Sequence, residues 1–146
     1  MKKSLKSSAG VTLLEIMLVL AVAAMVIVMS IRYYRGASNN RAANDTIEQI
    51  QAIATAMDSL AQASNSYAGI TISQIAPMVM GNSSASSITN AFGGAVTLGA
   101  LSPSTYVINE LGIPSDVCTI ITAQLKSNTK ITMGPSCSNY TYNSQG

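Results

Sequence analysis

The sequence predicts an α+β protein in which a long N-terminal helix, half of it transmembrane and half amphipathic, packs on a small antiparallel-sheet head domain with one disulfide. Three observations support this fold class. A continuous apolar stretch lies near the start of the 146-residue chain, an apolar repeat of helical period follows it, and short apolar pieces between turn residues make up the rest. The predicted divisions are a cleaved basic leader at 1–10, an apolar helix able to span a membrane at 11–31, its amphipathic continuation at 32–63 and a globular head domain at 64–146.

The leader carries three lysines and ends in the small residues Ala9 and Gly10. An ordinary secretory signal has its small-residue cleavage site after the apolar stretch, whereas here the small residues come before it. A peptidase that cuts after Gly10 would therefore leave the apolar segment in the mature protein. Removing the three leader lysines leaves five basic residues against six acidic ones, so a polycation built to bind nucleic acid is not expected.

Residues 11–31 contain one charge, Glu15, among Leu, Val, Ile, Met and Ala. At about 1.5 Å per residue, a helix of this length spans roughly 30 Å, which is enough to cross a bilayer. Lysines precede the segment, and Arg32, Arg35 and Arg41 follow it, so the charge distribution alone does not fix the orientation. We predict a cytoplasmic N-terminus, because the two cysteines of the head favour an oxidising compartment.

Glu15 has three interpretations. Thr12-x-x-Glu15 ahead of an apolar run is a helix capping box, in which the carboxylate returns to an amide at the helix start. A second interpretation is a carboxylate that snorkels toward the headgroups. Neither explains why a basic leader ending in Gly10 precedes it. An acid inside a bilayer costs about 2.5 to 3.5 kcal/mol on insertion scales, and in the third interpretation the amino terminus of a neighbouring copy offsets part of that cost.

The helical pattern continues beyond the membrane segment. Apolar residues recur at steps of three and four, and polar residues occupy the other faces. No proline occurs between residues 11 and 76, so residues 12 to about 63 are predicted to form one helix, with Gly36 as its weakest point. The stripe expected to face a core consists of Ala43, Ile47, Ile50, Ile53, Ala54, Met57, Leu60 and Ala61.

The predicted head consists of short elements separated by turns. Pro114 is typical of a helix start, and the alternation of Tyr106 and Ile108 with Val107 is typical of a strand. The elements expected are a polar loop at 81–90, a turn at 91–94, strands at 95–98, 105–108 and 130–133, a helix at 116–126 and a polar tail from Ser138. The loop, the tail and the segment between the two cysteines are candidate contact surfaces, with a plain solvated loop as the alternative for each.

The only two cysteines, Cys118 and Cys137, lie in the head. In an exported domain an even cysteine count most simply means a disulfide, and closing a loop of about 20 residues contributes on the order of 3 kcal/mol. The alternative is two buried free thiols in a cytosolic protein. The chain has no histidine, and its few acidic residues do not cluster, so metal sites, cofactors and histidine-based catalysis are not expected.

At the leader junction the chain resembles the type IV pilins. The signature of that family is a basic leader ending in Gly, a hydrophobic first residue, then Thr-Leu-Leu/Ile-Glu and an apolar helix; here it reads Gly10, Val11, Thr12, Leu13, Leu14 and Glu15. The resemblance implies cleavage between Gly10 and Val11 by the prepilin peptidase, N-methylation of Val11, and extraction from the inner membrane into a helical filament of identical subunits. It also implies that Glu15, with Thr12 beside it, acts in assembly by neutralising the amino terminus of an adjacent subunit.

Valine rather than phenylalanine at the first mature position points to the type IVb branch. Weaker similarity to the bundle-forming pilin and to the thin-pilus pilins of conjugative plasmids runs through Tyr33-Tyr34, 66–69, 88–94 and the cysteine pair. The resemblance implies a non-enzymatic surface filament for adhesion, aggregation or conjugation, with the inner-membrane assembly platform and its ATPase as partners. The precursor would lie in the inner membrane with its head in the periplasm, and the assembled subunit would lie outside the cell.

Other functions are compatible with the sequence. Among filament proteins, the alternatives are a minor pilin or a type II secretion pseudopilin, although the cysteine pair and the lack of an acidic cluster for calcium disfavour the major pseudopilin. From another class, the alternative is a signal-anchored periplasmic binding domain, which would stay monomeric in the membrane and have no use for cleavage at Gly10. An enzyme is disfavoured, because no base or oxyanion group accompanies the Ser, Thr, Cys and Tyr residues.

Overall fold

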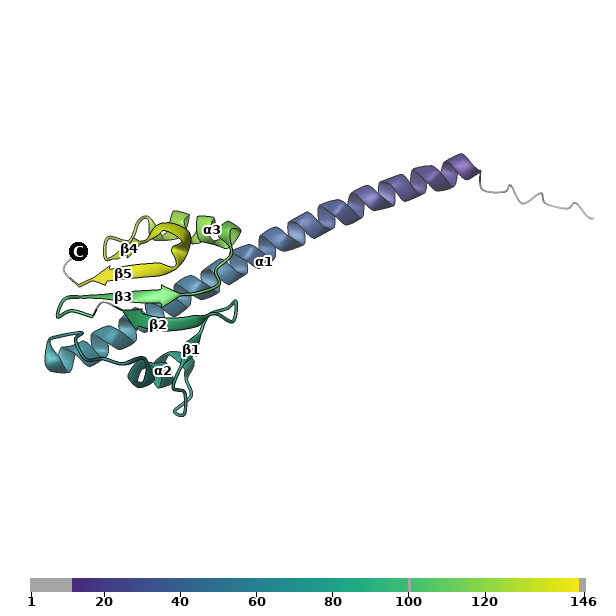
Figure 1. The fold of residues 1–146 in the computed structure, drawn as a ribbon. Coiled ribbons are helices and arrows are strands. Elements are labelled where there is room, and N and C mark those ends of the chain that lie inside the picture. Colours follow the sequence, from purple (N-terminus) through teal and green to yellow (C-terminus); the bar gives the residue numbers. More distant parts are fainter. Residues whose placement is uncertain (1–11, 100, 145–146) are drawn as a thin grey trace, which may run out of the picture. The chain divides into compact units, whose positions relative to one another are not determined.

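The computed structural model describes residues 12–99 and 101–144, and it has the expected α+β architecture, with a long N-terminal helix, a small antiparallel sheet and one disulfide (Figure 1). The chain divides into two compact units, the first ending at Ala37 and the second beginning at Ser38. Gly36 lies inside the first helix. In chain order the elements are α1 (Leu13–Ser64), α2 (Ile72–Met80), β1 (Ile88–Thr89), β2 (Ala95–Gly99), β3 (Thr105–Glu110), α3 (Ser115–Leu125), β4 (Ile131–Met133), the 3-10 helix η1 (Pro135–Cys137) and β5 (Asn139–Asn143).

In the second unit, α1 buries the expected apolar stripe against the head. Ile47 and Leu60 are only partly buried, and the other expected members of the stripe are buried. Ala56 and Thr46 are buried as well, and the sequence did not point to them. Thr46 is tolerated there because its hydroxyl donates a hydrogen bond to the Ala42 carbonyl oxygen at 2.9 Å, so this buried donor is paired.

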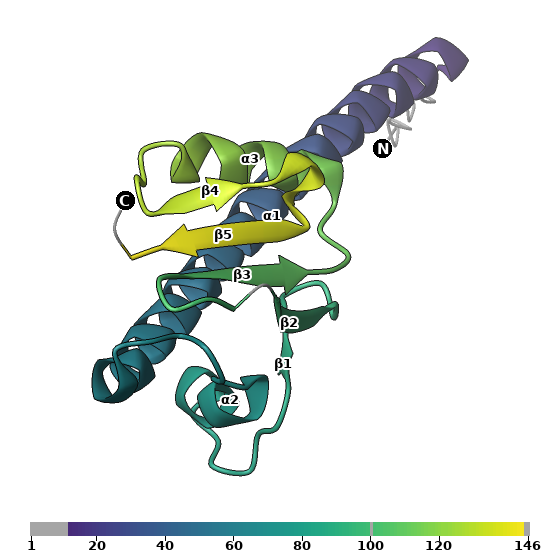
Figure 2. The same ribbon diagram turned by 60° about the vertical axis from the view of Figure 1, so that its left-hand side comes forward.

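The five strands form one antiparallel sheet in the order β1-β2-β3-β5-β4 (Figure 2). The register places Ile108 of β3 opposite Tyr140 of β5, and Tyr106 opposite Tyr142. All four side chains are buried in one apolar core with residues of α1 and α3. The strands predicted at 95–98, 105–108 and 130–133 are therefore confirmed within two residues at each end.

Two predictions about the head were wrong. Ile88 and Thr89 belong to the predicted polar loop at 81–90, yet they form strand β1 and pair with β2. The predicted polar tail from Ser138 contains strand β5, which lies between β3 and β4. The polar composition of the tail hides an alternation in which Tyr140 and Tyr142 face the core and their neighbours do not.

Helix α2 occupies a segment for which no element is predicted. Pro77 lies inside it, and a proline within a helix removes one backbone hydrogen bond, which masks the helical pattern. The start of α2 does carry a signal in the sequence, because Thr71 and Gln74 have the spacing of a capping box. The backbone N–H of Thr71 donates to Oε1 of Gln74 at 2.8 Å, and Ile75 and Ala76 are buried.

The predicted helix at 116–126 is α3, displaced by one residue, and the predicted disulfide is confirmed. Val117, Ile121 and Leu125 form the buried face of α3. Cys118, on the same helix, is bonded to Cys137 of η1, and their Cα atoms lie 5.6 Å apart. The disulfide therefore ties α3 to the turn that leads into β5.

Removal of the disulfide is expected to destabilise the head. The double variant Cys118→Ala and Cys137→Ala should lower the free energy of unfolding by about 2 to 3 kcal/mol, because the unfolded chain gains the freedom of the opened loop. Urea unfolding of the full-length protein in detergent micelles, followed by tyrosine circular dichroism, measures this loss, with the exposed Ser138→Ala as control. A loss no larger than that of the control would show that apolar contacts alone hold α3.

The predicted turn at 91–94 is organised by Asn90. Oδ1 of Asn90 accepts hydrogen bonds from the backbone N–H groups of Phe92 at 3.1 Å and Gly94 at 2.8 Å. Nδ2 of Asn90 donates to the Leu111 carbonyl oxygen at 2.8 Å. A Cβ atom at position 94 would collide with that same carbonyl group, so glycine is required there. The turn is thereby fastened to the end of β3.

Candidate assembly site

The first part of α1, up to Ala37, presents an exposed apolar surface. Its most apolar 18-residue window has a mean hydropathy of 2.7, and none of that window is buried. By length and composition, α1 is the one helix among residues 12–99 and 101–144 that could cross a membrane. Full burial of each large apolar side chain is worth about 1.5 to 3 kcal/mol, so this surface favours an apolar environment. The exposed residues are Leu13, Leu14, Ile16, Met17, Leu18, Val19, Leu20, Val22, Met25, Val26, Ile27, Val28, Met29 and Ile31.

Thr12 and Glu15 lie together at the start of α1. The backbone N–H of Glu15 points at Thr12, with Oγ1 at 3.3 Å and the carbonyl oxygen at 3.0 Å. Thr12 therefore caps the helix. The return bond of a full capping box is missing, because no hydrogen bond or ion pair within the described residues reaches the Glu15 carboxylate. Within the described residues, that carboxylate therefore has no hydrogen-bond or ion-pair partner.

The predicted cleavage site, Gly10 and Val11, lies outside the described residues, as does the leader at 1–10. Cleavage after Gly10, methylation of Val11 and an amine partner for Glu15 therefore stay predictions.

Aromatic and basic side chains follow the apolar segment of α1. Tyr33 and Tyr34 are 82% and 74% exposed, and the exposed Arg32 and Arg35 flank them. Tyrosine and arginine favour the boundary between hydrocarbon and water, where the apolar part of the side chain is covered and the polar end meets the headgroups. These four residues mark the place where a membrane-spanning stretch of α1 would end.

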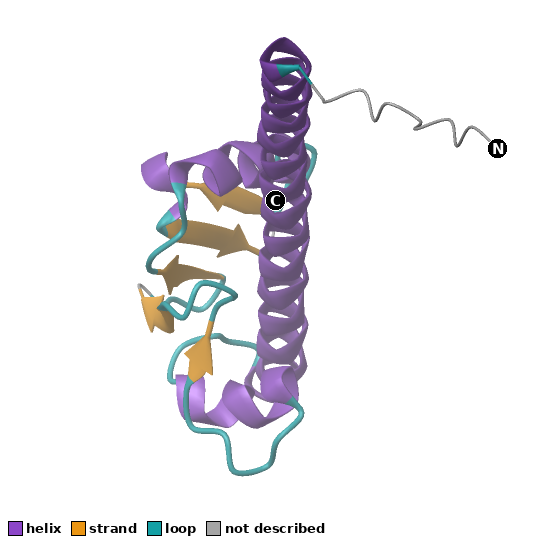
Figure 3. Cartoon of the chain, turned by 90° about the vertical axis from the view of Figure 1, so that its right-hand side faces the viewer, coloured by secondary structure: helices purple, strands orange, loops and turns teal. Residues whose placement is uncertain are grey.

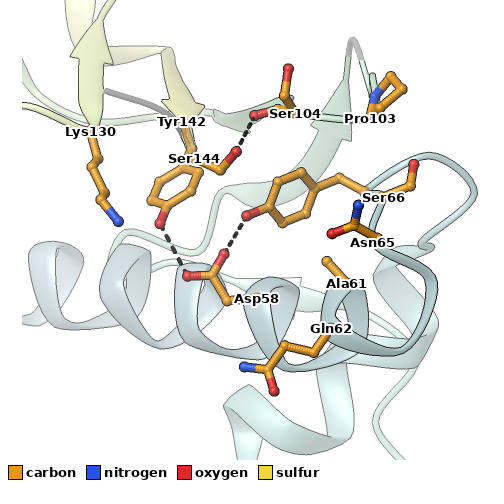
Figure 4. A pocket seen from close by; sticks show the side chains of 11 residues that line it. Asp58, Ala61, Gln62, Asn65, Ser66, Pro103, Ser104, Lys130, Tyr142 and Ser144 are labelled. Carbon is orange, nitrogen blue, oxygen red and sulfur yellow. Dashed lines mark hydrogen bonds between the residues drawn. The ribbon is translucent and has the colours of Figure 1, made fainter.

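The head contains a polar cavity of about 470 Å³ beside the C-terminal end of α1 (Figure 4). The Asp58 carboxylate, which lines it, accepts hydrogen bonds from the hydroxyls of Tyr67 at 2.5 Å and Tyr142 at 3.1 Å. Burial, with a smaller contribution from Asp58, raises the pKa of both tyrosines above its ordinary value, so both stay neutral donors. Asp58 therefore fastens α1 to β5 and to the loop that carries Tyr67.

The same tyrosines belong to an aromatic cluster under the sheet. The ring centroid of Tyr106 lies 4.9 Å from that of Tyr67 and 4.9 Å from that of Tyr142. The sequence did not point to this cluster, because its members come from three separate segments. The pairing of Asp58 with Tyr142 joins residues 84 positions apart, a distance over which no local pattern carries information.

Glu110, the last residue of β3, is a buried acid. Its side chain is 1% exposed, and neither carboxyl oxygen has a hydrogen-bond partner among the described residues. Burial raises the pKa of Glu110 to about 7, against a smaller opposing effect of the nearby Asn90 side chain. The hydroxyl of Tyr140 is also buried and has no hydrogen-bond partner among the described residues. Burial, with a smaller contribution from the charge of Glu110, raises the pKa of Tyr140 above its ordinary value. Every second side chain of β3 is buried from Tyr106 onward. This alternation is the pattern from which the burial of Glu110 could have been predicted.

Comparison of the chain with protein-family models, with curated proteins and with solved structures gives no match.

Proposed function

We propose that this chain is the structural subunit, or pilin, of a type IV pilus, and that it polymerises through its apolar N-terminal helix into a surface filament. The observation that carries the proposal is the exposed apolar segment of α1, with one carboxylate, Glu15, near its start. A helix of this composition requires apolar surroundings both before and after assembly. A bilayer supplies them first, and a bundle of identical helices supplies them after extraction.

In the proposed precursor, the leader lies in the cytoplasm, the segment at 11–31 spans the inner membrane and the head folds in the periplasm. The Cys118–Cys137 disulfide fits that location, because disulfides persist in oxidising compartments. The prepilin peptidase cuts between Gly10 and Val11, and the new amine is methylated. The assembly platform, driven by its ATPase, then moves the subunit into the filament. The chain itself catalyses no reaction and needs no cofactor.

Glu15 would act when a subunit leaves the membrane for the filament. A carboxylate in hydrocarbon is costly unless a cation lies beside it. The amino terminus of an adjacent subunit is such a cation, and Val11 stands one helical turn from Glu15 in the sequence. A pairing of the two would therefore hold neighbouring helices at a stagger of about 6 Å.

The heads would form the outer surface of the filament. Adhesion, aggregation of cells and conjugation are the uses proposed for it, and all three depend on the exposed loops of the head. The segment at 81–87 and the exposed side chains around η1 are among the surfaces available for such contacts.

Immunogold electron microscopy of whole cells tests the proposal. Cells that express the chain, and cells from which its gene is deleted, are labelled with an antibody against residues 38–144. We expect labelled filaments along their whole length in the first and none in the second. Sparse label on filaments made of another protein would indicate a minor pilin. Label confined to the cell envelope, with no external filament, would contradict the proposal and favour a signal-anchored domain or a pseudopilin.

A further inference from the structure

One face of α1 in the second unit carries opposite charges that have no partner among the described residues. Arg41, Asp45 and Glu48 are exposed. Within residues 12–99 and 101–144, no ion pair and no side-chain hydrogen bond engages any of the three. They form a basic-to-acidic stripe along the helix, because the steps from one to the next are four and three residues.

This charged stripe lies opposite the core. Each of its members comes nine residues, or two and a half helical turns, before a buried residue of α1: Ile50, Ala54 and Met57 respectively. A separation of two and a half turns places two side chains on opposite faces. In the second unit, the sheet and α3 lie to one side of α1 (Figure 3), where the buried residues of α1 join the core. The helical spacing places the charged stripe on the opposite side.

Pairing within one chain does not account for the stripe. Arg41 and Asp45 have the spacing of a helical ion pair, but the cation comes first, which is the less favourable order against the helix dipole. An exposed pair of this kind is worth less than about 1 kcal/mol. The structure has no such pair, so both charges remain available to another molecule.

We propose that the charged stripe docks on α1 of a second copy of this chain, with Arg41 of one copy beside Asp45 or Glu48 of the other. The inference rests on the proposed function, in which all copies share one membrane orientation and so remain parallel. Parallel helices staggered by four residues, about 6 Å, bring Arg41 of one copy level with Asp45 of the next. A stagger of seven residues, about 10 Å, brings it level with Glu48. The stripe carries both positive and negative side chains, so the same stripe on a second copy is complementary to it. Charge complementarity therefore favours a second copy of this chain as the partner.

The stripe continues into small residues whose polar groups are already satisfied. Ala52, Thr55 and Ser59 follow at the same three- and four-residue steps. The Thr55 hydroxyl donates to the Gln51 carbonyl oxygen at 2.9 Å, and the Ser59 hydroxyl donates to the Ala56 carbonyl oxygen at 2.8 Å. If a second helix covered these side chains, neither hydroxyl would be left buried without a hydrogen-bond acceptor. This part of the helix face can therefore pack closely against a second helix.

Charge reversal with rescue tests the inference. Arg41→Glu alone, and Asp45→Arg with Glu48→Arg, each place like charges together between copies, and we expect the yield of sheared filaments to fall about tenfold or more. The triple variant with all three reversals restores the complementarity, and its yield should return to within about twofold of wild type. The matched controls are Asp116→Arg in the first turn of α3 and Lys126→Glu directly after its last residue, which reverse exposed charges and should leave the yield unchanged.

A second measurement covers variants that fail for another reason. In Arg41→Cys with Asp45→Cys, and in Arg41→Cys with Glu48→Cys, oxidation of filaments should link subunits into a ladder for at least one of the two. The inference would be overturned by any of three results: a wild-type filament yield from Arg41→Glu or from Asp45→Arg with Glu48→Arg, no rescue by the triple variant, or no ladder in either double-cysteine variant. The proposed function would stand in each case. If the wild-type chain itself forms no filaments, the proposed function fails instead, and the inference fails with it.

Discussion

Replacing Glu15 by alanine is expected to abolish filaments and leave the rest of the subunit intact. The substitution removes the one charge of the apolar segment, so it should favour residence in the bilayer by about 2.5 to 3.5 kcal/mol on insertion scales. It also removes the partner of the incoming amino terminus. Each 1.4 kcal/mol corresponds to a factor of ten in an equilibrium. The added preference for the bilayer should therefore lower the filament yield by about a hundredfold or more. Quantitative immunoblotting of sheared material against the membrane fraction measures this loss.

The matched control for Glu15→Ala is Met17→Ala, which truncates an exposed apolar residue of the same segment and should lower the yield far less. Leader removal and the Cys118–Cys137 disulfide should be normal in both variants, since neither change alters Gly10, Val11 or the head. Normal filament abundance from Glu15→Ala would contradict the proposed role of the carboxylate. Loss of the processed chain from the membrane would instead show that the substitution acts on stability or cleavage.

The head is expected to lose stability as the pH rises from about 4.5 to about 7, because of Glu110. Its pKa is raised from the ordinary 4.5 to about 7 by burial, so the folded state keeps the proton in a range where the unfolded state has lost it. The stabilisation is fully present below about 4.5, falls as the pH rises and is gone above about 7. The full difference is about 3 kcal/mol, since each pH unit between the two pKa values contributes about 1.4 kcal/mol. Urea unfolding of the full-length protein in micelles at pH 4.5, 6 and 8 measures it.

Glu110→Gln should remove most of this pH dependence. The amide cannot ionise, so the variant should be more stable than wild type at pH 8 and close to it at pH 4.5. The control is Glu48→Gln, which neutralises an exposed carboxyl with no side-chain partner among the described residues and should keep the wild-type slope. Equal slopes for Glu110→Gln and wild type would show that water or a local rearrangement solvates the carboxylate.

Much of the fold follows from local patterns in the sequence. Helix α1 is predictable because a continuous apolar stretch leads into an apolar repeat with steps of three and four residues, and because no proline occurs between residues 11 and 76. Helix α3 follows from Pro114 and an apolar face, and the disulfide follows from the cysteine count in a domain preceded by a membrane segment. In each case one physical constraint acts over a few neighbouring residues, so the sequence alone reveals it.

The missed elements depend on distant partners. Strand β1 contains two residues, and only its pairing with β2 distinguishes it from loop. Strand β5 is polar by composition, and its position between β3 and β4 gives Tyr140 and Tyr142 their burial. Asp58 and Glu110 are alike in this respect, since the surroundings of each are built by segments far away in the chain. Short-range periodicity contains none of that information.

The assembly residues are a different case. The order of basic, small and apolar residues alone predicts the leader junction at Gly10 and Val11. The described residues add a capped helix start, with a Glu15 carboxylate that has no partner among them. The charged stripe, in contrast, looks like an ordinary solvated helix face in the sequence. Only the position of the core on the opposite side of α1 shows that the stripe is uncovered.

Mass spectrometry of intact subunits from sheared surface filaments tests the central claim most directly. The claim is that the apolar helix survives removal of the leader and passes from the membrane into the filament. The predicted dominant species begins at Val11, carries one methyl group and contains the Cys118–Cys137 disulfide. A dominant species that keeps the three leader lysines, or one that begins after Ile31 and so lacks the apolar segment, would contradict it.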